Sequence, residues 1–250
     1  MKKKTKKLNI KRIILLLFII GLVIYFYNRN NDQPLNIINI SSNSGYKTIK
    51  LDENKNYTGI GQEKVKNKDG YFTTFTTIDS HKKTYIEYKQ NGDSSWSEKE
   101  YWGGTMADNG CGITALAIIL SGYDKKYSPE DLRQKYYPVL NYDSLSKELS
   151  NTFKIENSGF YYDSVYFSQK KLQEHLQTNR PILVCVWNSP HDNRWTTASH
   201  YMVLLATDNK DMVYISNPNG GYNDSKSSGW YHFKEIIPYI AKALYIGSYN

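Results

Sequence analysis

Residues 104–120 read GTMADNGCGITALAIIL and hold Cys111, one of the chain's two cysteines, between two glycines. The residues before Cys111 are mostly polar turn formers, whereas the apolar residues after it recur at helical spacing. We therefore predict a mostly buried helix from Cys111 to about Ser121, ended by Gly122 as its C′ residue. Cys111 itself has two interpretations. It is either a small buried residue that opens a core helix, or a nucleophile whose thiolate is stabilised by the helix N-terminus.

Helices are expected first along the chain, and an antiparallel sheet second. Ser128 caps a second helix in SPEDLRQKYYP, which Pro138 ends, and two more helices are predicted near residues 144–153 and 168–177. Apolar, β-branched runs predict strands at 180–187, 199–207, 212–217, 230–233 and 242–249, the last two on either side of a short helix, KEIIPYI. Two earlier strands, 71–79 and 83–89, precede a long loop over residues 90–110. This order predicts an α+β fold with the helical part packed on the sheet.

The first 70 residues differ in composition from the rest. Residues 1–12 carry seven Lys or Arg side chains and no acid, and residues 13–27 form a 15-residue apolar run. Such a run is short for a full span of roughly 20 residues and suits either a membrane anchor or a signal peptide. Its basic flank orients the N-terminus inside, and no small-x-small cleavage site follows, which favours the anchor. Residues 28–70 predict a polar stalk, and residues 71–250 a folded domain outside the cytoplasmic membrane, anchored or secreted.

The net charge of +8 is concentrated in that N-terminal block. Outside it, 25 basic residues nearly balance 24 acidic ones. No nucleic-acid-binding motif or phosphate-binding loop is recognisable, so a nucleic-acid partner is not expected. No His, Cys and acidic residues have the spacing of metal ligands, and HDN at 191–193 is too little for a site. We expect neither a metal nor a cofactor.

A nucleophilic cysteine needs a base, and His200 is the best placed of the five histidines. It begins the apolar strand SHYMVLLAT, which would hold the ring rigidly beside a loop. The next strand, MVYISN, ends in Asn217, and a hairpin of the two strands would bring His200 and Asn217 together at its open end. Asn217 would then orient the imidazole, or it simply begins an Asn-Pro turn. The other histidines are three expected at the surface, His81, His175 and His232, and a weaker loop candidate, His191.

Two further residues bear on this site. Gln90 lies where the strand 83–89 meets the long loop, and a Gln amide can donate to an oxyanion together with the backbone N–H of Cys111. Cys185 lies in PILVCVW, the kind of strand in which buried free cysteines are common, so no disulfide with Cys111 is expected.

Taken in order, these residues resemble the papain-like bacteriocin-processing cysteine peptidase family, in its stand-alone, exported branch. The similar segments are QNGDSSW, YWGGTMADNGCGITALAIILSGY, YSPEDLRQKY, RPILVCVW and SHYMVLLATDNKDMVYISNPNGG. The resemblance covers about residues 84–250 and implies Cys111 as nucleophile, His200 as general base and Gln90 as oxyanion donor. The family usually has Asp where this chain has Asn217, and a neutral Asn can also orient a histidine. The loop between Gln90 and Cys111 is longer than in the transporter-linked branch.

The resemblance implies a membrane-anchored, extracytoplasmic cysteine peptidase that cleaves a peptide or protein substrate through an acyl-enzyme. A second hypothesis is a catalytically silent surface-binding module of the same fold. Tyr is abundant, and four tryptophans are expected near the site, namely Trp96, Trp102, Trp187 and Trp195. A third is cell-wall amidase or acyltransferase chemistry on the same residues, because specificity depends on loops.

Overall fold

The computed structural model describes residues 61–66, 71–76, 82–92, 94–188, 193–208, 210–219 and 228–247. These residues belong to one compact unit, Tyr46–Asn250. The basic tail (1–12), the apolar segment (13–27) and the expected stalk up to residue 60 lie outside the described residues. Within the described ranges, none of the helices is both long and apolar enough to span a membrane.

The largest element of the fold is an antiparallel sheet of six strands in the order β10-β9-β8-β7-β11-β6. Its strands are β6 (Asn157–Tyr161), β7 (Ile182–Trp187), β8 (Ser199–Thr207), β9 (Met212–Ser216), β10 (Gly229–His232) and β11 (Ile240–Ile246). The predictions for β7 to β11 are confirmed with small shifts at the strand ends. Strand β6 was not predicted, because NSGFY has no apolar alternation and pairs with the sheet only through β11.

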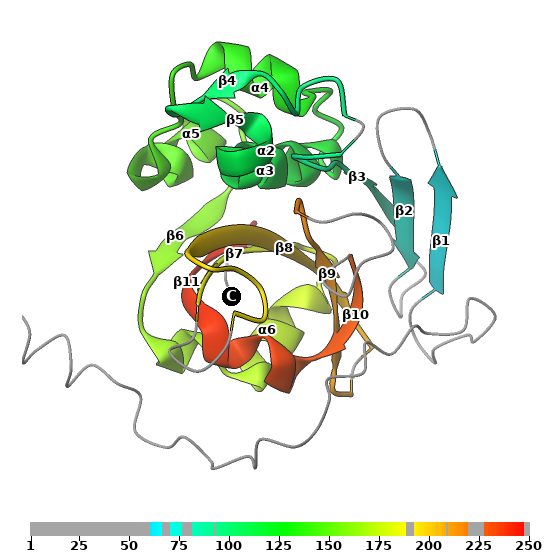
Figure 1. Cartoon of the computed structure of the whole chain (residues 1–250). Helices are drawn as coiled ribbons and strands as arrows, with labels where there is room; N and C mark the ends of the chain where they lie inside the picture. Colours follow the sequence, from blue (N-terminus) through cyan, green and yellow to red (C-terminus); the bar gives the residue numbers. More distant parts are fainter. Residues whose placement is uncertain are drawn as a thin grey trace, which may run out of the picture. The chain divides into compact units, whose positions relative to one another are not determined.

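Helices lie on both faces of this sheet (Figure 1). The helices on one face are α2 (Met106–Asn109), α3 (Cys111–Ser121), α4 (Pro129–Lys135) and α5 (Leu145–Asn151), and α6 (Gln169–Leu176) lies on the other. Four 3₁₀ turns connect elements, η1 (Tyr142–Ser144), η2 (Ser164–Phe167), η3 (Phe233–Glu235) and η4 (Ile237–Tyr239). The predicted α+β class is confirmed. The predicted helix KEIIPYI is wrong, since Pro238 removes a backbone donor and two 3₁₀ turns form instead.

Helix α3 is apolar on all sides and is buried between other elements. Residues 112–120 are all buried, and the helix packs on β8, α4 and β3. Gly122 ends the helix as predicted, but its φ of −72° is not left-handed. A glycine is needed there because a Cβ would lie 2.1 Å from the ring of Tyr85. The position of the helix is therefore determined by packing along its whole length, including its first residue, Cys111.

The opposite face of the sheet has its own core. Leu172 and Leu176 of α6 pack with Val184 of β7 and Met202 of β8. Successive residues of β7 and β8 pack alternately in this core and in the core around α3. Both strands are therefore buried on both faces, which explains their nearly continuous apolar sequence. The two strands that flank the candidate site are consequently among the most enclosed parts of the described structure.

A small antiparallel sheet of three strands precedes the helices, β1 (Gly61–Lys66), β2 (Tyr71–Thr76) and β3 (Lys82–Glu87). Strand β1 lies inside the range 28–70 that was expected to be a polar stalk. Phe75 of β2 packs edge-on against Tyr214 of β9, with ring centroids 4.9 Å apart. The small sheet thus contacts the large one and brings the end of β3 close to the end of β9.

The predicted loop 90–110 contains local structure before Cys111. A two-strand hairpin, β4 (Glu100–Tyr101) and β5 (Gly104–Thr105), leads directly into α2. Thr105 and Asp108 form a capping box at the start of α2. The main chain therefore enters Cys111 from an ordered turn of helix.

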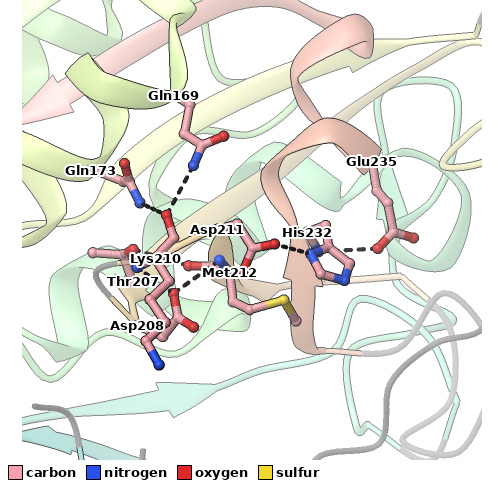
Figure 2. A network of polar contacts seen from close by, with 9 residues as sticks. All are labelled: Gln169, Gln173, Thr207, Asp208, Lys210, Asp211, Met212, His232 and Glu235. Atoms are coloured by element: carbon pink, nitrogen blue, oxygen red, sulfur yellow. Dashed lines mark hydrogen bonds and ion pairs between the residues drawn. The ribbon is translucent and has the colours of Figure 1, made fainter. Parts of the chain in front are cut away.

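The β8–β9 hairpin is held at its turn by a polar network (Figure 2). Asp208 Oδ1 accepts from the backbone N–H groups of Lys210 and Met212, both at 2.9 Å. Gln169 and Gln173 of α6 donate to the Lys210 carbonyl. Because the turn is fixed to α6, the register of the two strands is fixed as well, and with it the residues that meet at the open end.

Candidate functional site

Cys111 occupies the first position of α3, with Gly110 as the N-cap. Its thiol lies against the backbone N–H of Tyr201 on β8, and the N–H groups of Gly112 and Cys111 also favour negative charge on the sulfur. Burial raises the pKa of the thiol, and these three donors oppose that rise. Protein atoms surround the sulfur although the residue itself is partly exposed. The sulfur therefore lies inside the fold beside three backbone donors at the start of α3.

The residue after the cysteine has to be small. A Cβ on Gly112 would lie 2.2 Å from both the ring and the hydroxyl of Tyr142. The Tyr142 ring stacks on that of Tyr201, with centroids 4.7 Å apart and an interplanar angle of 19°. This tyrosine pair joins η1 to β8 immediately beside the start of α3.

His200 and Asn217 are brought together at the open end of the β8–β9 hairpin. Both are buried, and His200 Nε2 lies 2.7 Å from Asn217 Oδ1. The same Oδ1 accepts from the backbone N–H of Asn219 at 2.9 Å, which identifies it as the amide oxygen. In the neutral imidazole the proton is then on Nε2, so the Nδ1 lone pair is the group that can accept a proton.

Gln90 lies just beyond the end of β3, between α2 and the Asn217 turn. Its side chain is only 2% exposed, and Nε2 donates to the carbonyl of Ala107 in α2 at 2.7 Å. Its backbone N–H donates to the carbonyl of Pro218 at 2.9 Å. A primary amide has two N–H groups, so one remains for another acceptor after the bond to Ala107. Of the four predicted residues, His200 and Asn217 contact each other, Gln90 bonds to the neighbouring Pro218, and the Cys111 thiol lies against the residue after His200.

Lys89 was not recognised from the sequence. It is 5% exposed, and Nζ donates to the carbonyl of Asn217 at 2.5 Å and lies 3.3 Å from Ser228 Oγ. Its own carbonyl accepts from Trp96 Nε1 at 2.7 Å. A lysine in a Tyr-rich strand carries no sequence signal of burial, because the acceptor that permits burial lies 128 residues further along the chain.

Glu87 is a second buried polar residue on the same strand. Its carboxylate accepts from Tyr214 at 2.7 Å and from Ser216 at 3.1 Å, both on β9, and also from Thr73 on β2. A buried carboxylate is tolerated when donors surround it in this way. Glu87 therefore ties β2 and β9 to the end of β3, shortly before Lys89 and Gln90.

The expectation for one histidine is wrong, and the four tryptophans differ in exposure. His175 was expected at the surface, but it is buried on α6 with Nε2 3.1 Å from the carbonyl of Ile246. Trp96 and Trp195 are core residues, whereas Trp102 and Trp187 are 59% and 53% exposed. The sequence context of these residues was polar, and the apolar partners that bury them come from distant segments. His81 and His191 lie outside the described residues.

The described residues hold few other groups suited to chemistry. No three His, Cys, Asp or Glu side chains of the described part gather as metal ligands. Cys185 is a buried free thiol on β7, and Cys111 is also free. His232, partly exposed, interacts with Asp211 near the turn at the far end of the hairpin (Figure 2).

Comparison with known proteins gives one family. A family model described as Peptidase_C39 like family matches residues 82–237, which is more than half of the chain. A search of curated proteins finds no match. The matched range contains Gln90, Cys111, His200 and Asn217, and it supports a cysteine peptidase of papain-like fold.

Proposed function

We propose that this chain, which belongs to the Peptidase_C39 like family, hydrolyses peptide bonds with Cys111 as nucleophile, His200 as general base and Asn217 as the residue that orients His200. The observation that carries the proposal is the 2.7 Å contact between His200 Nε2 and Asn217 Oδ1. The next residue on β8 is Tyr201, whose backbone N–H lies against the Cys111 thiol. The contact directs Nδ1, the proton-accepting nitrogen, away from Asn217. The substrate is a peptide or protein.

The proposed reaction has two stages. His200 Nδ1 takes the thiol proton, and the Cys111 sulfur forms a bond to the substrate carbonyl carbon. The developing oxyanion accepts from the Cys111 backbone N–H and from the second N–H of the Gln90 amide. The C–N bond breaks as His200 returns the proton to the leaving amine. Water then attacks the thioester, His200 takes its proton, and the carboxylic acid leaves with the thiol restored.

Asn217 differs in charge from the Asp that the family usually has. A neutral amide holds the ring in one tautomer and orientation, which is the positioning part of the role. It adds no negative charge beside the imidazolium. In the ion pair of the Cys111 thiolate with protonated His200, stabilisation of the negative charge then depends on the three backbone N–H groups around the sulfur.

The test is peptide cleavage by the domain outside the predicted membrane segment, read by mass spectrometry on a proteome-derived peptide library. We expect cleavage by the unaltered protein, and no cleavage by Cys111→Ala or His200→Ala. Cys185→Ala is the matched control, because it removes the other thiol and should leave cleavage intact. Equal cleavage by the Cys111→Ala protein would refute the proposal.

A surface-binding module remains the second candidate, and one observation favours it. Trp102 is exposed at the β4–β5 turn with a left-handed φ of 50°, and Asn109 Nδ2 donates to its carbonyl at 3.1 Å. An aromatic side chain held outward by a strained backbone is a feature of binding surfaces. A binding module needs no reactive thiol, so slow alkylation of Cys111 together with retained peptide binding would favour it over the peptidase.

The proposed location is outside the cytoplasmic membrane, with residues 13–27 as anchor. It rests on the basic block and apolar run of the sequence. Protease added to intact cells should degrade the domain, and a cytoplasmic control protein should survive. A domain protected until the cells are lysed would contradict this location.

A further inference from the structure

Lys242 lies on the same row of the sheet as the residue that contacts the Cys111 thiol. Across adjacent strands, Tyr201 of β8 pairs with Cys185 of β7, and Cys185 pairs with Lys242 of β11. Directly paired residues of antiparallel strands point to the same face. Tyr201 and Cys185 both pack in the core on the α3 face, so Lys242 is on that face as well. Two strand spacings put the Cα of Lys242 about 10 Å from the Cα of Tyr201.

Aromatic rings surround the ammonium group of Lys242. Nζ lies 4.7 Å from the ring centroid of Phe160, 5.5 Å from that of Tyr201 and 5.8 Å from that of Tyr162. Lys242 is partly exposed, and Tyr162 is 65% exposed. The rings hold the charge at a defined place while one side of it faces solvent.

No described carboxylate neutralises this charge. The ion pairs of the described residues do not include Lys242. Asp143 is close enough for its charge to act on the Tyr201 hydroxyl, but it is exposed on η1 and forms no ion pair with Lys242. The charge of Lys242 acts on the neighbouring Cys185 thiol on the same face of the sheet. It is the largest influence that opposes burial in setting the pKa of the Cys185 thiol, a thiol that also feels Cys111.

We propose that Lys242 is a specificity residue that binds a carboxylate of the peptide substrate, within about three residues of the bond that is cleaved. The reach follows from the separation of about 10 Å and a rise of roughly 3.3 Å per residue in an extended peptide. An ammonium group that forms no ion pair with the described residues, and that lies beside the exposed Tyr162 ring on the nucleophile's face of the sheet, selects an acidic group over a neutral one. This inference rests on the proposed function for its substrate.

The first experiment compares kcat/KM for peptides that carry Glu or Gln at each of the three positions on either side of the cleaved bond. The unaltered protein should prefer Glu at one position by roughly fivefold to tenfold, the range of a partly shielded ion pair. Lys242→Gln should remove the preference, and Lys242→Glu should reverse it toward the Gln peptide. A peptide with no charge should be cleaved equally by all three proteins. Paired peptides with free and amidated C-termini distinguish a side-chain carboxylate from a terminal one.

The second experiment does not depend on turnover. Binding of the Glu and Gln peptides is measured by calorimetry on the Cys111→Ala protein, with and without Lys242→Glu. The Glu peptide should bind more tightly only when Lys242 is present. The role of Lys242 is refuted if Lys242→Glu leaves the ratio of the Glu peptide to the Gln peptide unchanged, both in kcat/KM and in affinity. A failure of the proposed function is recognised separately, because the uncharged peptide would then show no Cys111-dependent cleavage.

Discussion

The ionisation of Cys111 depends on contributions of opposite sign. Burial raises the thiol pKa, and the N–H groups of Tyr201, Gly112 and Cys111 lower it. A helix start alone therefore does not make this thiol acidic. On the proposed mechanism the remaining stabilisation of the thiolate comes from protonated His200, so the reactivity of the sulfur should depend on that residue.

Alkylation measures this dependence directly. Cys111 should react with iodoacetamide at mildly acidic pH in the unaltered protein, because the thiolate is paired with the imidazolium. In His200→Ala, burial still raises the thiol pKa without that compensation, so the reaction should appear only at alkaline pH. The pH dependence of the rate is read by mass spectrometry in a Cys185→Ala background. Identical pH profiles with and without His200 would exclude the ion pair.

Gly112 offers a second test at the scale of single residues. Gly112→Ala puts a methyl group 2.2 Å from Tyr142, and relief of the clash should cost about 1–3 kcal/mol of the free energy of unfolding. Tyr142→Leu makes room for the methyl group, so the double variant should be more stable than the sum of the two single changes predicts. Urea denaturation of the four proteins gives the coupling. Strict additivity would show that the two residues do not interact.

At the scale of elements, the site depends on strand ends that meet. The segment after β3 contacts the turn after β9 through Lys89 to Asn217, Gln90 to Pro218 and Asn91 to Asn219. The β8–β9 hairpin is fixed at its other end by the network around Asp208 (Figure 2). Asn217 is thus held from both ends of its hairpin.

Lys89→Met tests the first of these restraints. The variant leaves a buried carbonyl of Asn217 without its donor, a loss of about 1–3 kcal/mol. Because the carbonyl belongs to the residue that orients His200, kcat should fall while KM changes little. Lys83→Met on the same strand is the control, since Lys83 contacts the Tyr123 ring, 3.6 Å from Nζ, and not the hairpin. An unchanged kcat in Lys89→Met, together with a lower melting temperature, would make Lys89 merely structural.

Helix α6 is attached to β11 through His175, which makes stability depend on pH. Burial lowers the pKa of His175 from its usual 6.5 to about 4. The unfolded chain therefore binds a proton below pH 6.5 that the folded protein does not take up until about pH 4, and stability falls across this window by up to roughly 3 kcal/mol. His175→Gln should flatten the dependence of urea midpoints on pH between 6.5 and 4. An equal slope in unaltered and His175→Gln proteins would contradict the linkage.

The elements that could be predicted from the sequence are those with strong periodicity or caps. Helix α3 and strand β8 agree with their predicted bounds, because each is a continuous apolar run with a clear start. The capping box from Thr105 to Asp108 was readable in TMAD, although the short helix it begins was taken as loop. Strand β6 and the buried Lys89 could not be found, since both depend on partners from remote strands.

At the scale of the whole molecule, the family match and the folded unit have different limits. The match ends at residue 237, but β11 follows it and lies between β7 and β6 in the sheet. The match begins at residue 82, after β2, whose Thr73 and Phe75 contact Glu87 and Tyr214. The described fold therefore extends beyond the matched range in both directions.

A truncation tests this difference. A chain limited to residues 82–237 should not unfold cooperatively, because loss of β11 exposes the edge of β7 and separates β6 from the sheet. The full domain from residue 46 should show a single transition in circular dichroism and calorimetry. A cooperative transition in the short chain would mean that β11 contributes little to the sheet.

The carboxylate of Glu87 accepts hydrogen bonds from hydroxyl groups of β2, early in the domain, and of β9, late in it. Gln90 follows Glu87 by three residues, so the contacts of Glu87 with β2 and β9 also restrain the segment from which the Gln90 amide reaches Ala107. On the proposed mechanism, hydrolysis therefore depends on contacts between the small and the large sheet as well as on Cys111 and His200.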